Sequence, residues 1–323
     1  MKPDPRPTVS DVGEETLIAR ITGRLGGPPA GEIWSGDDAA VIRGGPQMVL
    51  TTDMVVEGVD FERSYASGVD VGYKAIAVNV SDVIAMAALP AHAVCAVAFP
   101  PRLPAEWVDD LTDGLVAAAQ DFGVALVGGD VGRGSEVMVS VAMTGIPAGA
   151  AAVTRWGAAP GDLVCVTGEL GAARAGLEAL RRGAVDADAT LLRAQLRPSP
   201  PIAAVPVLAR WTPTAMLDLS DGLARDLGRL LDAAGVGCDV DAEGLPIAAG
   251  VERYGDPLET AVVGGEDYQL LFTMSESVWH GAERALAAAG TPARRIGMIT
   301  AGDAIVAGKP LDEWRRRSWE HLA

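Results

Sequence analysis

The chain has 323 residues, of which 49% are hydrophobic and only 5% aromatic, so its cores must be built largely from Ala, Val and Leu. Its formal charge of −17, from 43 acids against 26 bases, disfavours nucleic acid and anionic membranes as partners. We expect no signal peptide and no membrane span, because no sufficiently long apolar run occurs. The three cysteines are far apart in apolar contexts, which predicts buried thiols in a cytoplasmic protein.

Hydrophobic periodicity predicts helices and strands without strict alternation, which is typical of two α+β domains. In the first half we expect helices over 14–25, 71–89 and 104–123 and strands over 48–50, 93–99, 124–127 and 137–144. An Ala- and Gly-rich stretch over 147–152 places the domains at 1–150 and 151–323. In the second half we expect helices over 172–182, 222–234 and 283–289 and strands over 163–167, 215–219, 238–240 and 296–300. Two strand-like runs should flank a Gly-Gly-Glu-Asp motif within 262–273.

Five short motifs share one design, in which an apolar run ends in small residues and then a carboxylate. They are Ser35-Gly36-Asp37-Asp38, Thr51-Thr52-Asp53, Val127-Gly128-Gly129-Asp130, Asp218-Leu219-Ser220-Asp221 and Val263-Gly264-Gly265-Glu266-Asp267. A sixth acid, Asp82, shares a face of an apolar helix with Asn79. Desolvating a carboxylate without a partner costs free energy, and few Lys or Arg residues lie beside the motif carboxylates in the sequence to pair with them. The pattern predicts a magnesium–phosphate site assembled from distant parts of the chain.

Each motif alone has a plainer interpretation. A Gly-Asp pair is usually a turn, and Asp221 could cap the helix that follows it. Asn79 and Asp82 could form an internal hydrogen-bonded pair. The sequence contains neither a GxxxxGK[ST] loop nor a GxGxxG loop, so ATP would have to be held through metal ions and backbone amides. The scattered histidines and cysteines give poor support to a His/Cys metal site or a Ser-His-Asp triad.

Taken together and in this order, the motifs resemble those of the thiamine-monophosphate kinases. Further stretches carry the likeness from Gly13 to Trp319, namely Tyr73-Lys74, Arg133, Thr154-Arg155, Pro160-Gly161-Asp162 and Leu196-Arg197-Pro198. The resemblance implies a two-domain α+β fold like that of aminoimidazole ribonucleotide synthetase, with the N-terminal sheets of two subunits paired in a homodimer. It also implies direct in-line transfer of the γ-phosphoryl group of ATP to thiamine monophosphate with several Mg²⁺ ions.

The resemblance assigns roles by position. The first domain would bind ATP and Mg²⁺ and form the dimer, and the second would complete the nucleotide and substrate site. The implied magnesium ligands are Asp38, Thr51, Thr52, Asp53, Asp82, Asp130, Asp218 and Asp221, and Asp53, Asp130 and Asp221 are the implied catalytic acids. The implied nucleotide contacts are Gly129, Asp130, Arg155 and Ser220, and the implied substrate contacts are Glu266 and Trp319. These acids would hold metal and not carry protons, because a phosphate acceptor is already ionised near neutral pH.

One position departs from the family pattern. The segment Gly58-Val59-Asp60-Phe61 has Asp60 where the family usually has a histidine near the substrate. A further negative charge should weaken binding of a phosphate-bearing acceptor unless a cation accompanies it. Asp60 therefore points away, recruits Mg²⁺, or serves a different acceptor. Two alternatives stay open, a related superfamily kinase with another acceptor and a nucleotide-binding homologue without catalysis.

Overall fold

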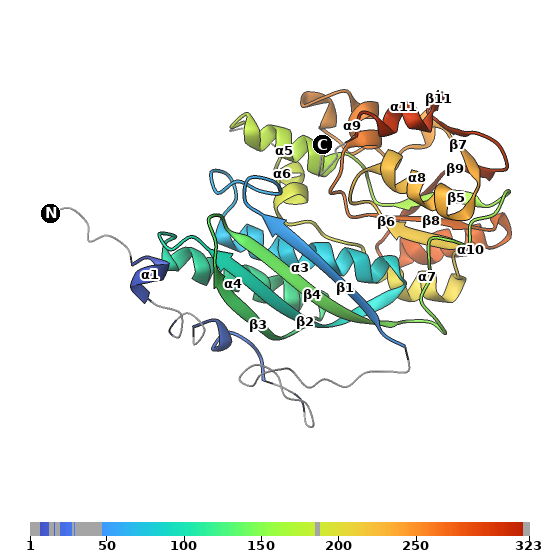
Figure 1. Ribbon diagram of the computed structural model, residues 1–323. Coiled ribbons are helices and arrows are strands. Elements are labelled where there is room, and N and C mark those ends of the chain that lie inside the picture. Colours follow the sequence, from blue (N-terminus) through green and yellow to red (C-terminus); the bar gives the residue numbers. More distant parts are fainter. Residues whose placement is uncertain are drawn as a thin grey trace. The chain divides into compact units, whose positions relative to one another are not determined.

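The computed structural model describes residues 7–12, 16, 20–27, 29, 47–184 and 188–318 (Figure 1). They fall into two compact units, Met1–Val83 with Pro90–Ile146 and Ile84–Leu89 with Pro147–Ala323. The second unit therefore includes a short segment from the first half of the chain. Within the part that the structure describes, no helix is both long enough and apolar enough to cross a membrane.

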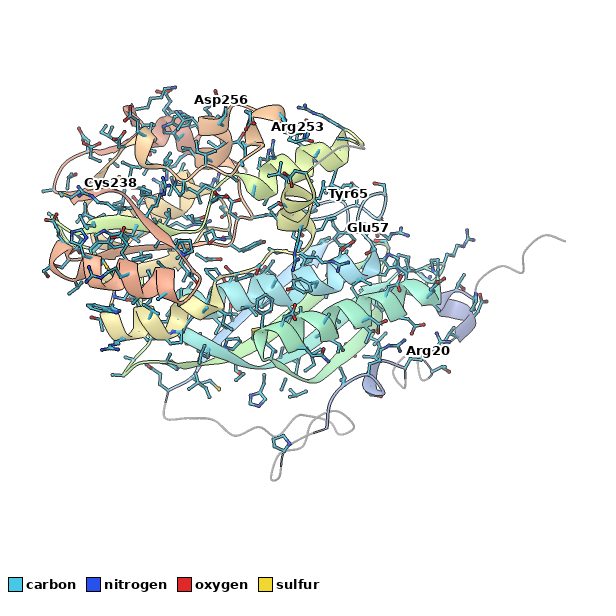
Figure 2. All side chains as sticks on the ribbon, turned by 180° about the vertical axis from the view of Figure 1, so that it is seen from behind. Arg20, Glu57, Tyr65, Cys238, Arg253 and Asp256 are labelled. Atoms are coloured by element: carbon cyan, nitrogen blue, oxygen red, sulfur yellow. The ribbon has the colours of Figure 1, made fainter. Side chains whose placement is uncertain are left out.

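The first unit is built on a four-stranded sheet with two long helices on one face (Figures 1 and 2). The strands are β1 (Val49–Val56), β2 (Ala88–Phe99), β3 (Ala125–Arg133) and β4 (Met138–Pro147), in the order β1-β4-β2-β3. Strand β1 runs antiparallel to β4, and β2 runs parallel to β3. The helices are α3 (Gly68–Ala85) and α4 (Ala105–Phe122), and a short helix α1 (Val9–Val12) precedes them.

The two long helices approach each other so closely that only glycine fits between them. A Cβ atom at Gly72 would lie 2.1 Å from the carbonyl oxygen of Leu111, and one at Gly114 would lie 2.1 Å from that of Val69. This contact fixes α3, the helix that carries Asp82, against α4.

The four-stranded sheet has one covered face and one open face, because side chains alternate along each strand. On the helix side, Val55 of β1 and Val141 of β4 are buried. The other side, which we call the open face, carries exposed apolar side chains; Leu50 is 70% exposed and Met54 is 52% exposed. Its further apolar members are Val94, Met138 and Ile146.

The second unit is built on a seven-stranded sheet in the order β11-β10-β7-β9-β5-β8-β6. Its strands are β5 (Leu163–Thr167), β6 (Ala215–Asp218), β7 (Gly237–Val240), β8 (Leu270–Met274), β9 (Ala293–Thr300), β10 (Ala304–Val306) and β11 (Lys309–Pro310). Its helices are α5 (Ala172–Arg181), α6 (Ala189–Leu196), α7 (Val205–Trp211), α8 (Leu223–Ala234), α9 (Pro257–Val263), α10 (Glu276–Ala288) and α11 (Leu311–Arg315), with 3₁₀ turns at Ile202–Ala204, Ala242–Gly244 and Val251–Arg253. Leucines of α8 and Trp314 of α11 pack into the core on one face, and Trp279 of α10 contacts Phe272 of β8 on the other.

Several sequence predictions are confirmed. The mixture of helices and sheets confirms the α+β class. Helix α4 begins after Pro104 and ends before Gly123, which adopts the left-handed conformation with φ of 69°. Strand β5 spans the predicted residues 163–167. Of the helix expected over 14–25, residues 20–22 are helical and most of the others lie outside the described residues.

Three sequence predictions were wrong in detail. The Thr-Thr-Asp and Gly-Gly-Asp motifs do not end their strands, because β1 stays paired with β4 to Val56 and β3 stays paired with β2 to Arg133. Helix α3 ends at Ala85 and β2 already begins at Ala88, because Ala87 between them has left-handed backbone with φ of 52°. The apolar run before Gly264 is the end of helix α9, since Asp256 caps that helix through the Glu259 N–H group at 2.8 Å.

Candidate functional site

The predicted site residues lie in both units, and each unit is described by itself. The first unit carries Thr51, Thr52, Asp53, Asp60, Asp82, Gly129 and Asp130, and the second carries Arg155, Asp218, Ser220, Asp221 and Glu266. Asp38 and Trp319 lie outside the described residues.

Strand β1 and helix α3 bring part of the predicted magnesium set together. The Thr51 hydroxyl donates to a carboxylate oxygen of Asp82 at 2.5 Å. Asp53 lies two residues further along β1, so it shares this side of the strand with Thr51. The Thr52 side chain points to the opposite side and donates to the Val141 carbonyl of β4 at 3.0 Å. The Thr51 hydroxyl and the Asp82 carboxylate are therefore in contact, Asp53 lies on the same side of β1, and the Thr52 side chain does not join this group of oxygen donors.

Strand β3 places Gly129 and Asp130 at the other edge of the same sheet. A Cβ atom at Gly129 would lie 2.1 Å from the Cys95 carbonyl oxygen, so the close pairing of β3 with β2 requires glycine here. Strands β4 and β2 separate β1 from β3. Three strand spacings amount to about 14 Å, whereas Mg²⁺ binds oxygen at about 2.1 Å. Asp53 and Asp130 of one chain therefore cannot share one ion.

Asp60 belongs to the turn that follows β1. One of its carboxylate oxygens accepts the Val56 backbone N–H at 2.8 Å. Its carbonyl oxygen accepts a hydrogen bond from the Lys74 ammonium group at 3.3 Å, and Lys74 is only 4% exposed. The turn thus engages the carboxylate, and a buried cation lies beside this residue. The sequence reasoning assigned Lys74 no role in the site; a lysine within an almost wholly apolar helix was the available signal.

In the second unit, the loop after β6 runs alongside the loop before β8. The backbone N–H of Glu266 donates to the Ser220 carbonyl at 2.8 Å, and that of Tyr268 donates to the Leu219 carbonyl at 2.9 Å. Gly265 permits the approach, because a Cβ atom there would lie 2.6 Å from the Ser220 carbonyl oxygen. This pairing brings Ser220 and Glu266 together from distant parts of the chain.

The loop before β8 contains two strained residues. Glu266 has φ of 70° and Tyr268 has φ of 48°, and neither is glycine. Each such residue costs on the order of 1 kcal/mol, so the surrounding hydrogen bonds must hold it in place. Backbone strain of this kind is concentrated at functional sites in proteins.

Asp221 forms an ion pair with Arg229 of helix α8. The same guanidinium contacts Asp226 at 2.6 Å, and the other oxygen of Asp226 accepts the Asp221 backbone N–H at 2.9 Å. Burial raises the pKa of Asp226 to about 7, against the opposing effect of Arg229. Helix α8 has Gly222 at its N-cap and no side-chain cap, so Asp221 does not cap it. Asp226 and Arg229 are functional candidates that the sequence reasoning missed.

Glu266 is held by a buried amide. Gln195 of helix α6 is 2% exposed, and its Nε2 atom donates to Glu266 Oε2 at 2.7 Å. Because a carboxylate only accepts, the amide nitrogen must face it, which leaves the buried Gln195 Oε1 without a hydrogen-bond partner among the residues that the structure describes. Gln195 is a second residue that the motif pattern did not indicate.

The neighbouring acid, Asp267, has a structural role. Its carboxylate accepts the backbone N–H groups of Gly171 at 2.7 Å and Ala173 at 3.2 Å, at the N-terminus of α5. Desolvation raises the pKa of Asp267 to about 7, and these hydrogen bonds oppose the rise. Asp267 therefore anchors a helix, although it belongs to one of the five motifs.

Asp218 and Arg155 both belong to the β6 edge of the larger sheet. Asp218 ends β6 and is 9% exposed. The segment that carries Arg155 lies along β6, since the Thr154 carbonyl accepts the Met216 N–H at 3.0 Å. Arg155 itself is exposed to solvent, which suits a side chain that meets an anionic ligand.

The oxygen donors of the first unit suit Mg²⁺, but they do not form a metal site without further ligands from water or substrate. Within the described residues, no three Asp, Glu, His or Cys side chains converge to hold a metal ion. Mg²⁺ is usually bound by one or two carboxylates together with water and substrate phosphates. The group of Thr51, Asp53 and Asp82 offers only hard oxygen donors, as such a complex requires.

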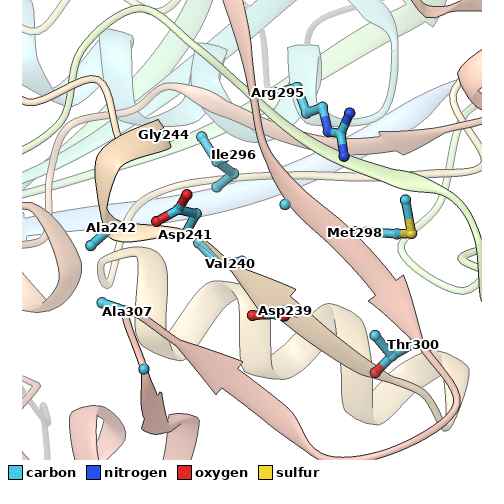
Figure 3. Close-up of a pocket in the computed structure, with 12 residues that line it drawn as sticks. Asp239, Val240, Asp241, Ala242, Gly244, Arg295, Ile296, Met298, Thr300 and Ala307 are labelled. Atoms are coloured by element: carbon cyan, nitrogen blue, oxygen red, sulfur yellow. The ribbon is translucent and has the colours of Figure 1, made fainter.

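A groove of about 670 Å³ lies on the β7–β9 part of the larger sheet (Figure 3). Its lining includes Asp239, Asp241, Arg295 and Met298. It contains none of the predicted site residues.

Comparison with known proteins identifies the family. Residues 36–147 match the N-terminal domain of AIR synthase related proteins, and residues 159–309 match their C-terminal domain. The thiamine-monophosphate kinase of Aquifex aeolicus (strain VF5) is 34% identical over 323 residues, covering 97% of this chain and 99% of its own. That of Escherichia coli (strain K12) is 36% identical over 299 residues, covering 90% of this chain and 91% of its own.

Solved structures agree with this result. The thiamine-monophosphate kinase of Stenotrophomonas maltophilia K279a matches with a TM-score of 0.79 at 32% identity, covering 92% of this chain and 96% of its own. AaThiL complexed with AMPPCP and TMP matches with a TM-score of 0.74 at 33% identity, covering 93% and 95%. The hydrogenase maturation protein of E. coli, at 18% identity and a TM-score of 0.74, shares the fold. The predicted resemblance is confirmed, and the chain belongs to the thiamine-monophosphate kinase family of AIR synthase related proteins.

Proposed function

We propose that this protein transfers the γ-phosphoryl group of ATP to thiamine monophosphate, producing thiamine diphosphate and ADP. The observation that carries the proposal is the contact between Thr51 and Asp82 on the side of β1 that also carries Asp53, in a chain that matches thiamine-monophosphate kinases over nearly its whole length. The first domain supplies metal and nucleotide contacts, and the second supplies further nucleotide contacts and the acceptor contacts.

The proposed chemistry is set by charge. Donor and acceptor are both anionic phosphates, and bound Mg²⁺ would neutralise their charge and align the in-line attack. Asp53 and Asp82 would hold such ions in the first domain, and Asp218 and Asp221 in the second; Asp38 has the same predicted role outside the described residues. Arg155, exposed beside β6, would supply a fixed positive charge to a phosphate. Ser220 and the backbone at Gly129 would contact the nucleotide.

The acceptor contacts are proposed for the Glu266 loop. Glu266 is a hydrogen-bond acceptor held in place by Gln195, so it suits the amino group of a pyrimidine or a cationic ring. Trp319, outside the described residues, keeps its predicted role of stacking on the thiamine rings.

Asp60 does not by itself require a different acceptor. A negative charge at Asp60 should repel the phosphate of the acceptor unless a cation accompanies it. The Asp60 carboxylate accepts the Val56 N–H within its own turn, and the Lys74 ammonium group lies 3.3 Å from the Asp60 backbone carbonyl oxygen, so a cation lies close to this residue. We therefore favour thiamine monophosphate over an altered acceptor.

A homodimer would resolve the separation of Asp53 from Asp130. The open face carries Leu50 and Met54, and an exposed apolar face of this kind marks an interaction surface. If two copies close their sheets into a barrel, the β1 edge of one meets the β3 edge of the other. Asp53 would then approach Asp130 of the partner subunit, and the metal site would be completed across the dimer.

We propose the cytoplasm as the compartment, in keeping with the free thiols of Cys165 and Cys238.

The test is to incubate the protein with ATP, Mg²⁺ and thiamine monophosphate and to measure thiamine diphosphate. We expect product that depends on Mg²⁺ and that Asp82→Asn abolishes. Absence of product across a range of Mg²⁺ concentrations would refute the proposal. ATP binding without turnover would instead support the non-catalytic alternative, and turnover only with another acceptor would support the related kinase.

A further inference from the structure

The Arg229 guanidinium bridges two carboxylates with two different nitrogens. Its Nη2 atom pairs with Asp221, and its Nη1 atom lies 2.6 Å from Asp226. Asp226 in turn accepts the backbone N–H of Asp221 at 2.9 Å. The three residues form a closed ring in which Asp221 is held both by its backbone and by its side chain.

The two carboxylates differ in their exposure. The Asp226 side chain is 2% exposed, so its charge depends on the guanidinium. The Asp221 side chain is 14% exposed and that of Arg229 is 43% exposed, so solvent ions can reach this side of the ring. Because different nitrogens hold the two acids, Arg229 can release Asp221 and still remain paired with Asp226.

We propose that Arg229 is the resident counter-ion of Asp221, and that a divalent cation must displace it from that carboxylate. Arg229 then sets the Mg²⁺ concentration at which this part of the site fills. The inference rests on the proposed function in taking Asp221 as a metal ligand.

The direction of the effect follows from competition. The guanidinium and the metal ion need the same carboxylate oxygens, and they repel each other as like charges. A half-exposed ion pair of this kind should weaken metal binding by about fivefold. If Arg229 merely oriented Asp221 for the metal, its removal would weaken binding, so the sign of the change separates the two roles.

The experiment measures Mn²⁺ binding to the full chain saturated with a non-hydrolysable ATP analogue, by electron paramagnetic resonance of the free ion, with the analogue alone as the reference. We expect Arg229→Gln to bind Mn²⁺ about fivefold more tightly than the parent. The matched control is Arg315→Gln, which removes a guanidinium that contacts Asp232 of the same helix at 2.6 Å without touching Asp221. It should leave Mn²⁺ binding unchanged.

Asp221→Asn distinguishes failure of this inference from failure of the proposed function. If that variant binds Mn²⁺ as the parent does, Asp221 is not a ligand, and both its proposed metal role and the inference fail. If Asp221→Asn weakens binding while Arg229→Gln leaves it unchanged or weaker, the inference is overturned and the metal role of Asp221 stands. If Arg229→Gln does not fold because Asp226 loses its partner, the double variant Asp226→Asn with Arg229→Gln decides, since it buries no unpaired charge. Binding by the double variant no tighter than by the parent would overturn the inference.

Discussion

Replacing Gln195 by Met should loosen the acceptor site and leave the nucleotide site intact. The Gln195 amide donates to Glu266 at 2.7 Å and is 2% exposed, so methionine fills a similar volume but cannot make the bond. A hydrogen bond to a charged group contributes about 1.5–3 kcal/mol. If that amount is lost from acceptor binding, the KM for thiamine monophosphate rises about 10- to 100-fold.

Little loss of overall stability should accompany this change. In the parent, the buried Gln195 Oε1 has no hydrogen-bond partner within the described part of the chain, and methionine removes that oxygen together with the useful donor. The gain offsets part of the loss, so the melting temperature should change by a few degrees at most. A kinetic effect without unfolding is therefore the expected signature.

The assay is initial-rate kinetics with each substrate varied at a saturating concentration of the other. Gln120→Met, at an exposed position of helix α4, is the matched control and should behave as the parent. An equal rise in the KM for ATP, or a fall in kcat with an unchanged acceptor KM, would show that Gln195 does not act by positioning Glu266 for the acceptor.

Three further changes test the structure. Desolvation raises the pKa of Asp267 from 3.8 to about 7, so this group binds more protons in the folded protein and lowers the free energy of unfolding between pH 4 and pH 7. Asp267→Asn should reduce this slope in denaturant titrations and leave the part that the raised pKa of Asp226 contributes, and an unchanged slope would contradict the prediction. Asp60→His should give no large gain in kcat/KM for thiamine monophosphate, because Lys74 already supplies a cation; a large gain would indicate a changed acceptor. Leu50→Asp should shift the sedimentation coefficient from that of a dimer to that of a monomer, since it places a charge on the open face, and an unchanged coefficient would remove this face from the interface.

The helix boundaries that the sequence predicts well are those with local signals. Helix α4 lies between Pro104 and Gly123 because proline suits a helix start and glycine accepts the left-handed backbone at its end. Both preferences act within a few residues and need no tertiary information.

The errors arise where a distant strand decides the outcome. Thr51-Thr52-Asp53 has the composition of a strand end, yet it stays extended because each residue pairs with β4, about ninety residues away in the sequence. The run Val262-Val263 favours a strand by composition, but the helix that begins at Asp256 already includes it. Pairing and upstream capping prevail over the propensity of a short segment.

The candidate site also depends on strand order, which a local sequence pattern does not reveal. The order of the motifs indicates a metal–phosphate site, but not that Asp53 and Asp130 lie on opposite edges of one sheet. That separation follows from the strand order, which no local pattern contains. It is also the strongest structural reason to expect that two copies of the chain complete the site.

The motif acids and Asp82 look alike in the sequence because each lies among small or apolar residues, and the structure separates those that it describes by their partners. The Asp267 carboxyl group accepts backbone N–H groups at a helix N-terminus, so its oxygens are used to hold the fold. The Asp82 carboxylate meets a threonine hydroxyl, a partner that carries no charge. Asp221 lies between these cases, because its partner is a guanidinium that can be exchanged. A carboxylate in such a motif is therefore a candidate metal ligand to the degree that its partner is neutral or displaceable, and that property becomes visible only in the folded chain.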